Sequence, residues 1–179
     1  MNNLKIKKMC VYAMGVALFV VLSLCLQVPI FENYYLCLGY VSMAIFCYYF
    51  GPVSGMIVGG MGVVLYCLLI SGLRGLPGWF VGNLIIGFVV GCTCKLTKKM
   101  KNNIIRQIII IISVIISTAI GILGAKSMVE CLLYSQPFLL RVAQNSFAFI
   151  ADIIVFSISI PLCFAIKPIM HKAFPELKT

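Results

Sequence analysis

The sequence has few charged residues. Only 10% of its 179 residues are Asp, Glu, Lys or Arg, and just four of them are acidic. A soluble domain carries about 25% charged residues, whereas a disordered chain contains few apolar ones. The shortage of charge, together with an apolar majority, therefore excludes an ordinary soluble domain, a disordered chain and a nucleic-acid-binding domain.

Groups that perform catalysis or bind metals are scarce too. The sequence has one histidine, His171, and no segment with the pattern of a phosphate-binding loop, a zinc protease or a nucleophile elbow. Its nine cysteines fall mostly in apolar stretches, where cysteine behaves as a small hydrophobic residue. We therefore expect no enzyme, no ATP hydrolysis by this chain alone, no metal site and no cofactor.

Apolar residues are abundant: they make up 63% of the chain and give it a mean hydropathy of +1.13. A membrane-spanning helix needs about 20 apolar residues, so six helices use about 120 residues and leave short loops. We predict an all-α polytopic membrane protein, one integral membrane domain over 1–179 built as a six-transmembrane-helix bundle. Charge-free stretches and the break at Gly51-Pro52 place the helices at about 9–31, 35–50, 53–70, 79–96, 103–125 and 137–166.

Lys and Arg residues predict the orientation. Six spans put eleven of the fourteen on the side of both termini: Lys5, Lys7, Lys8, Lys95, Lys98, Lys99, Lys101, Arg106, Lys167, Lys172 and Lys178. Arg74, Lys126 and Arg141 fall on the opposite side. The positive-inside rule then places both termini in the cytoplasm, and we interpret the eleven inner charges as bilayer anchors.

A polar stripe is expected along the last span. Asp152 is the single charged residue in 142–166, and a carboxylate at mid-membrane depth costs roughly 2.5–3.5 kcal/mol on insertion scales. Arg141, Asn145 and Asp152 fall within about 40° of one another around a helix. They predict a polar face that runs from the outer surface inward, flanked by Gln144.

Polar residues of other segments gather on the same outer side. If the fifth helix continues, Lys126, Glu130 and Tyr134 share one face, although a surface ion pair explains Lys126 equally well. Trp79 opens the fourth helix with Asn83 one turn deeper; interfacial Trp is most often a membrane anchor, but the two together favour a pocket. Tyr40 and the loop Glu32-Asn33-Tyr34-Tyr35 add further aromatic groups. This combination of aromatic and polar groups predicts an outward pocket for a small planar ligand.

Small residues recur at intervals of four. They include Ala13 and Ala17 on the first helix, Gly51, Gly55 and Gly59 on the third, and Gly87 and Gly91 on the fourth. Small side chains let membrane helices approach closely. We interpret the glycines as contacts within the bundle, while the alanine face is open to either packing within the bundle or docking of another protein.

Taken together, the motifs resemble those of a known family, the ECF-type riboflavin transporter S components, over most of the chain. Ala13-Met-Gly-Val-Ala17 is similar to the family's A-x-x-x-A, and the stretch 40–55 contains its F-G-P-x-x-G corner. Pro77-Gly-Trp79 is similar to a P-W-W, and the stretch 130–137 to a D-x-x-x-Y-G-E-P. Two positions depart from the family pattern: Gln136 replaces the acid of that last segment, and Gly39 replaces a polar residue before Tyr40.

The resemblance implies a multi-pass subunit in the plasma membrane of a bacterium. It would capture a vitamin or related micronutrient from outside, with riboflavin-like compounds as the best match. Its partners would be the ECF transmembrane coupling protein and two ABC ATPases, with Ala13 and Ala17 as the docking face. The expected substrate-binding residues are Tyr40, Trp79, Asn83, Glu130, Tyr134, Gln136, Arg141, Asn145 and Asp152. Thiamine, pyridoxine, pantothenate, folates and queuine-like bases also suit an aromatic pocket.

Two other hypotheses stay open at this point. The chain is a stand-alone secondary carrier if Asp152 acts as a proton relay. A membrane scaffold or a small enzyme is the third hypothesis, although no motif supports an enzyme.

Overall fold

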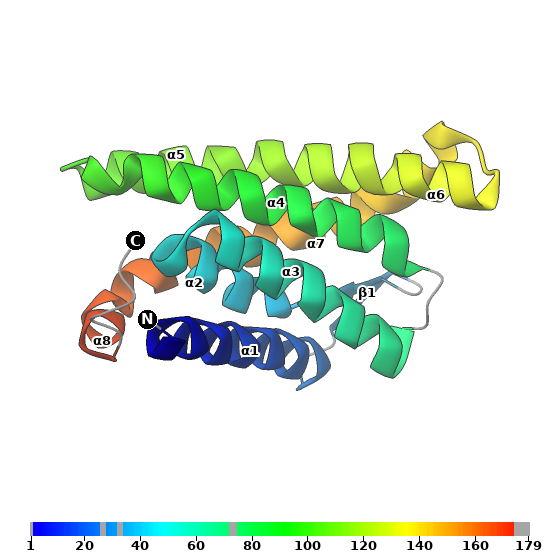
Figure 1. Cartoon of the computed structure of the whole chain (residues 1–179). Helices are drawn as coiled ribbons and strands as arrows, with labels where there is room; N and C mark the ends of the chain where they lie inside the picture. Colours follow the sequence, from blue (N-terminus) through cyan, green and yellow to red (C-terminus); the bar gives the residue numbers. More distant parts are fainter. Residues whose placement is uncertain (1, 26–27, 32–33, 72–74, 174–179) are drawn as a thin grey trace.

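The chain folds as a bundle of helices that lie roughly along one direction (Figure 1). The structure, a computed structural model, describes residues 2–25, 28–31, 34–71 and 75–173. Five helical segments of the described chain are long and apolar enough to cross a membrane: Lys5–Cys25, Pro52–Ile70, Leu76–Lys99, Asn103–Tyr134 and Phe138–Ala165. The chain is therefore a multi-pass membrane protein by the length and composition of its helices.

The individual elements follow the chain in this order. They are α1 (Asn2–Cys25), β1 (Val28–Phe31), β2 (Tyr34–Leu36), α2 (Gly39–Phe50), α3 (Pro52–Tyr66), η1 (Cys67–Ser71), α4 (Leu76–Leu96), η3 (Thr97–Lys99), α5 (Asn103–Thr118), η4 (Ala119–Lys126), α6 (Ser127–Tyr134), α7 (Phe138–Ala165) and α8 (Lys167–Ala173). Figure 1 shows α1 along one edge, with α4 and α5 along the opposite edge. α1 packs against α2 and α3, whereas α5 packs against α4 and α7.

The prediction was wrong between the first two helices. α1 ends at Cys25 rather than near residue 31, and α2 begins at Gly39 rather than at residue 35. The intervening chain forms an antiparallel hairpin in which Val28 pairs with Leu36 and Pro29 with Tyr35. Pro29 cannot continue a helical hydrogen-bond ladder, and β-branched and aromatic residues favour strands. Uncharged, apolar strands give the same hydropathy signal as a span, so that signal alone misplaced the helix ends.

The same error made the second predicted span too long. α2 has 12 residues, and a rise of about 1.5 Å per residue makes it about 18 Å long. The hydrocarbon core is about 30 Å thick. Five of the six predicted spans therefore reach the required length, whereas α2 is too short to cross unaided.

Glycines bring α3 and α4 into direct backbone contact, as their spacing suggests. A Cβ placed on Gly87 would lie 2.6 Å from the carbonyl carbon of Gly55, and one placed on Gly55 would lie 2.9 Å from the carbonyl oxygen of Gly87. No side chain fits in this gap. The contact fixes α4, and with it Trp79 and Asn83, against the α2–α3 pair.

Polar side chains lie inside the bundle while large apolar ones cover its outside. Asn83, Asn145 and Asp152 are buried, whereas Ile108, Ile112 and other large apolar residues of α5 are exposed. Lipid makes this arrangement favourable, because apolar side chains lose nothing by facing hydrocarbon and polar groups need partners within the protein.

Candidate functional site

The predicted outer site is built on a long continuous helix. α5, η4 and α6 follow one another without a break from Asn103 to Tyr134. The helix thus extends through Lys126, Glu130 and Tyr134 to a turn at Ser135, whose φ of 51° ends it. α7 then starts at Phe138 and runs back beside it, which brings Arg141 and Asn145 opposite Glu130.

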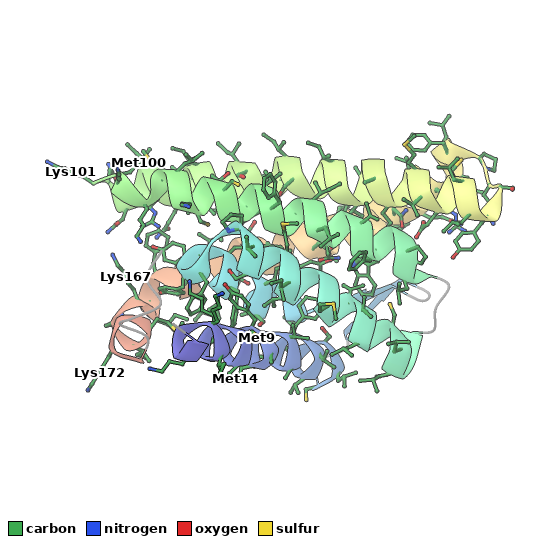
Figure 2. The ribbon with its side chains drawn as sticks, viewed as in Figure 1. Met9, Met14, Met100, Lys101, Lys167 and Lys172 are labelled. Carbon is green, nitrogen blue, oxygen red and sulfur yellow. The ribbon has the colours of Figure 1, made fainter. Side chains whose placement is uncertain are left out.

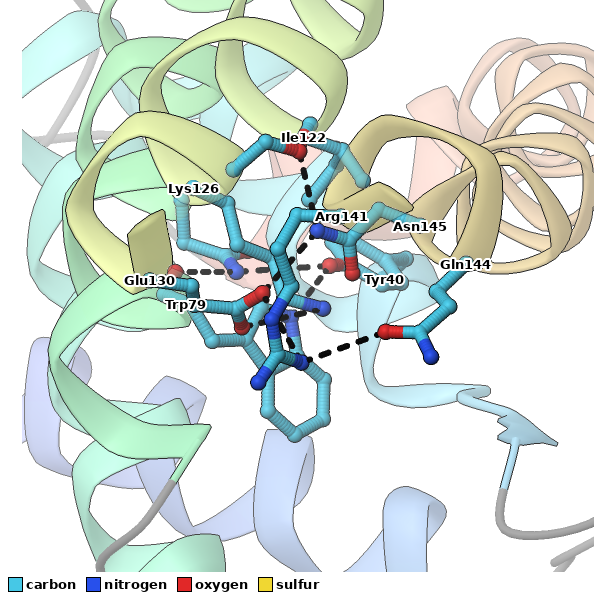
Figure 3. Close-up of polar contacts among 10 residues, drawn as sticks. Tyr40, Trp79, Ile122, Lys126, Glu130, Arg141, Gln144 and Asn145 are labelled. Carbon is cyan, nitrogen blue, oxygen red and sulfur yellow. Dashed lines mark hydrogen bonds and ion pairs between the residues drawn. The ribbon is translucent and has the colours of Figure 1, made fainter. Parts of the chain in front are cut away.

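Glu130 is the centre of the polar cluster (Figure 3). It is only 5% exposed, and its Oε1 lies 4.0 Å from Lys126 Nζ while its Oε2 lies 3.8 Å from Arg141 Nη1. Asn145 Nδ2 donates a 3.0 Å hydrogen bond to the same Oε2. One carboxylate therefore links α6 and α7 through two cations and an amide.

Ser127 extends this network below Glu130, and the sequence interpretation missed it. Its Oγ accepts a 2.9 Å hydrogen bond from Asn145 Nδ2 and donates to the carbonyl oxygen of Ile122 at 3.3 Å. A single serine beside a lysine gives no distinctive sequence signal. Its position three residues before Glu130, on the same face of a helix, is the one hint of it in the sequence.

Deeper in the bundle, hydrogen bonds link two aromatic residues, Tyr40 and Trp79, with the amide of Asn83; we call these three residues the aromatic group. Trp79 Nε1 donates a 2.9 Å hydrogen bond to the Tyr40 hydroxyl, and Asn83 Nδ2 donates to it at 3.3 Å. The Trp79 ring also stacks edge-on against Tyr66, with centroids 5.7 Å apart. Lys126 Nζ lies 6.0 Å from the centroid of the Trp79 ring and so joins the aromatic group to the cluster around Glu130.

Asp152 belongs to the same assembly. It is 4% exposed, its side chain is hydrogen-bonded with that of Tyr40, and Lys126 lies close enough to interact with it electrostatically. The Tyr40 hydroxyl accepts from both Trp79 and Asn83, so its own proton is free to be donated to Asp152. The polar face of α7 thus contacts Glu130 at its outer end and Tyr40 at its inner end.

A cavity of about 370 Å³ opens beside this cluster. It is lined by Gly75, Glu130, Tyr134, Gln136, Arg141 and Gln144. Four of these are predicted site residues, while Gln144 was expected only to flank the stripe and Gly75 was not singled out. The lining does not include the other five predicted site residues. The contacts above place these five alongside or beneath the cavity: Tyr40, Trp79, Asn83, Asn145 and Asp152.

Two buried polar atoms of the site have no hydrogen-bond partner among the described residues. They are Asn83 Oδ1, an acceptor, and Arg141 Nε, a donor. A buried polar atom without a partner costs about 1–3 kcal/mol, and such atoms call for a bound molecule or water. The polar cluster therefore contains one buried acceptor and one buried donor that the described residues leave without a partner.

α1 presents the expected small-residue face at the surface. Ala13 and Ala17 are exposed, together with the larger apolar side chains of Met14 and Leu18, whereas Phe19 faces the core. Figure 2 shows Met14 on the side of α1 that points away from the other helices. Of the remaining predicted groups, Glu32, Asn33 and Arg74 lie outside the described residues, as do the side chains of Tyr34 and Tyr35.

Comparison with known proteins identifies the family. The profile of the family "ECF-type riboflavin transporter, S component" matches residues 3–167. A UPF0397 protein of Streptococcus thermophilus (strain CNRZ 1066) is 27% identical over 173 residues, which cover 93% of this chain and 92% of that protein. A UPF0397 protein of Aliivibrio salmonicida (strain LFI1238) is 28% identical over 147 residues, or 79% of each chain.

The fold has a counterpart among solved structures. The crystal structure of the S-component for biotin from an ECF-type ABC transporter superposes with a TM-score of 0.64 at 19% identity, over 94% of both chains. That likeness shows a shared fold, and the profile match extends over nearly the whole sequence. This chain therefore belongs to the ECF-type riboflavin transporter S-component family.

Proposed function

We propose that this protein is the high-affinity substrate-binding subunit of an ECF-type ABC importer. It captures a vitamin or related micronutrient, with a riboflavin-like compound as the best candidate, and delivers it inward with ATPase partners. The observation that most supports this proposal is the 370 Å³ cavity beside a buried polar cluster that leaves Asn83 Oδ1 and Arg141 Nε without partners. The lining combines the ring of Tyr134 with several polar side chains, and aromatic and precisely placed polar groups are usual components of a small-molecule site.

The direction of capture follows from the charge distribution. α6 lies at the opposite end of the bundle from α8 and from the beginning of α1 (Figure 1). The lysines concentrate near that second end, which the positive-inside rule assigns to the cytoplasm. With both termini inside, the cavity next to α6 opens to the outside of the cell, and α2 with its preceding hairpin completes the sixth pass.

The charges of the cluster favour an uncharged ligand. Two basic side chains, Lys126 and Arg141, lie beside two carboxyl groups, those of Glu130 and Asp152, so their formal charges cancel. A ligand carboxylate at Arg141 would compete with Glu130 and place a second carboxylate beside it in a buried site, which is costly. A neutral heterocycle with donors and acceptors along one edge, as in a flavin ring, avoids that cost.

Delivery requires other proteins, because the sequence has no ATP-binding motif. We propose that the ECF transmembrane coupling protein docks on the face of α1 around Ala13 and Ala17 and connects the chain to two ABC ATPases. Small exposed residues allow a second helix to approach closely within lipid, and α1 lies at the edge of the bundle where a partner has access.

The test uses Trp79, the single tryptophan of the chain. Its indole contacts Tyr40 and Lys126 beside the cavity, so riboflavin bound in the cavity should quench its fluorescence. We expect saturable quenching of the purified protein with micromolar or tighter affinity, and a co-purified vitamin-like molecule detected by mass spectrometry. Absence of both a retained small molecule and quenching would refute the binding role.

A second measurement separates the importer subunit from a stand-alone carrier. Liposomes that contain only this chain should not accumulate ligand when a pH gradient is applied. Accumulation that depends on the gradient and on Asp152, without coupling protein or ATPases, would instead establish a proton-driven carrier.

A further inference from the structure

Arg106 does not behave as the surface anchor that its place in the sequence suggests. It lies in the first turn of α5, a few residues after the exposed Lys98, Lys99 and Lys101. Its side chain nevertheless turns inward, and the residue is only 5% exposed. The interpretation of Arg106 as an ordinary bilayer anchor was therefore wrong.

Two aromatic rings from other helices enclose its guanidinium group. Arg106 Cζ lies 4.6 Å from the centroid of the Tyr48 ring on α2 and 5.3 Å from that of Phe164 on α7. The two rings contact each other, with centroids 5.0 Å apart. Residues from α2, α5 and α7 thus form one aromatic cage around a cation.

This cation has no counter-ion among the described residues. The described carboxylates, Glu130 and Asp152, belong to the outer site and interact with Lys126, Arg141 and Tyr40 instead. Arg106 Nε and the Tyr48 hydroxyl are both buried without a hydrogen-bond partner. An arginine keeps its charge in any protein, and a buried charge without an anion is strongly unfavourable, so an anion is the missing component.

The surroundings of Arg106 indicate where that anion comes from. Ile104, Ile105 and Ile108 of α5 are exposed apolar residues beside it, while the exposed lysines begin just before the helix. Figure 2 shows Lys101 and Lys167 at this same end of the molecule. Arg106 thus lies where the apolar belt meets the basic end, which is the depth of lipid phosphate groups in the inner leaflet.

We propose that Arg106 and Tyr48 form a binding site for a phosphate group, supplied by an anionic phospholipid of the inner leaflet. The planar guanidinium group binds phosphate through two parallel N–H donors, and the Tyr48 hydroxyl is a further donor in the same cage. The site lies at the opposite end of the bundle from the cavity beside Glu130. The phosphate proposal therefore does not depend on the identity of the transported substrate.

Native mass spectrometry of the purified chain tests this site. The protein is equilibrated with equal amounts of phosphatidylglycerol and phosphatidylcholine, and the ratio of the two retained lipids is measured. We expect wild type to prefer phosphatidylglycerol, and Arg106→Gln to reduce the ratio about fivefold or more. Lys101→Gln removes an exposed charge from the same end and should leave the ratio nearly unchanged.

Two more variants keep the test decisive if Arg106→Gln does not fold. Arg106→Lys keeps the charge without the planar fork and should retain part of the preference, while Tyr48→Phe, which keeps the ring and removes the hydroxyl, should lower it. Equal ratios in wild type and these variants, or an equal loss in Lys101→Gln, would overturn the proposal.

Inorganic phosphate identifies the source of the anion. If free phosphate alone raises the thermal unfolding temperature of the wild type but not of the Arg106 variants, and the lipid ratio shows no preference, then the phosphate site is real and its ligand is soluble. If neither lipid preference nor phosphate protection depends on Arg106, no phosphate site exists there.

Discussion

At the scale of single residues, Glu130 determines how the outer site is held together. It is buried and contacts two cations and the amide of Asn145. If the carboxylate were removed, Lys126 and Arg141 would lose the anion that they share, and Asn145 would lose one of its two acceptors. Glu130 therefore acts on the shape and charge of the cavity as well as lining it.

Glu130→Gln should lower the free energy of unfolding by about 2 kcal/mol, because it leaves Lys126 and Arg141 without their shared anion. The thermal unfolding temperature of the purified variant measures this loss. Gln144→Ala is the matched control: this exposed residue lines the same cavity and contacts Arg141, and its loss should cost less than about 0.5 kcal/mol. A variant Glu130→Gln as stable as wild type would show that the two ion pairs contribute nothing.

Asn83 provides the unpartnered acceptor that we expect a ligand to use. Asn83→Ala should weaken riboflavin binding about tenfold or more, since one hydrogen bond in a buried site is lost. Trp79 fluorescence titration measures the affinity. Asn102→Ala serves as control, because it removes the cap of α5 at the other end of the bundle. It should reduce stability by about 1 kcal/mol and leave the affinity as it is; equal affinities for wild type and Asn83→Ala would remove Asn83 from the site.

At the scale of helices, the α3–α4 contact decides where the aromatic group lies. Gly87→Ala should destabilise the protein by about 1–3 kcal/mol, since its Cβ would overlap the backbone of Gly55. Gly75→Ala makes a clean control, because a Cβ there meets nothing within 4 Å. Thermal unfolding compares the two, and an equally small effect in both would mean that α3 and α4 separate without cost.

The exposed face of α1 around Ala13 and Ala17 is the surface on which we propose that the coupling protein docks. Ala13→Arg and Ala17→Arg should each abolish co-purification with the coupling protein and substrate uptake, because a long charged side chain keeps the partner helix away. Ligand binding, measured by Trp79 fluorescence, should stay unchanged. Ala165→Arg places the same change at an exposed alanine of α7 and should not affect docking. Uptake that survives both α1 changes would mean that the partner binds elsewhere.

The helices themselves show how far the sequence can be interpreted. Long uncharged stretches with Pro and Gly breaks located α3, α4 and α7 well, and the spacing of polar residues on two helices predicted that Glu130, Arg141 and Asn145 share a site. The hairpin after α1 and the inward turn of Arg106 were missed. The hairpin depends on local strand pairing, and the position of Arg106 on rings from α2 and α7, which are distant in the sequence. Neither hydropathy nor charge encodes these contacts.

At the scale of the whole molecule, the polar groups gather at the two ends of the bundle. The charge-balanced cluster and its cavity lie at one end, and the basic residues and the Arg106 cage at the other. Nothing in the sequence supplies energy for transport. We therefore expect uptake in reconstituted vesicles only when the coupling protein, both ATPases and ATP are present, and a pH gradient alone to have no effect.

Titration of the purified chain with riboflavin tests whether the outer cavity binds a vitamin-like molecule with high affinity, as we propose. Trp79 fluorescence should decrease in a saturable way with micromolar or tighter affinity, and Asn83→Ala should shift the titration to about tenfold higher concentration. The binding proposal would be wrong if Trp79 fluorescence did not respond to riboflavin and mass spectrometry detected no small molecule retained by the protein.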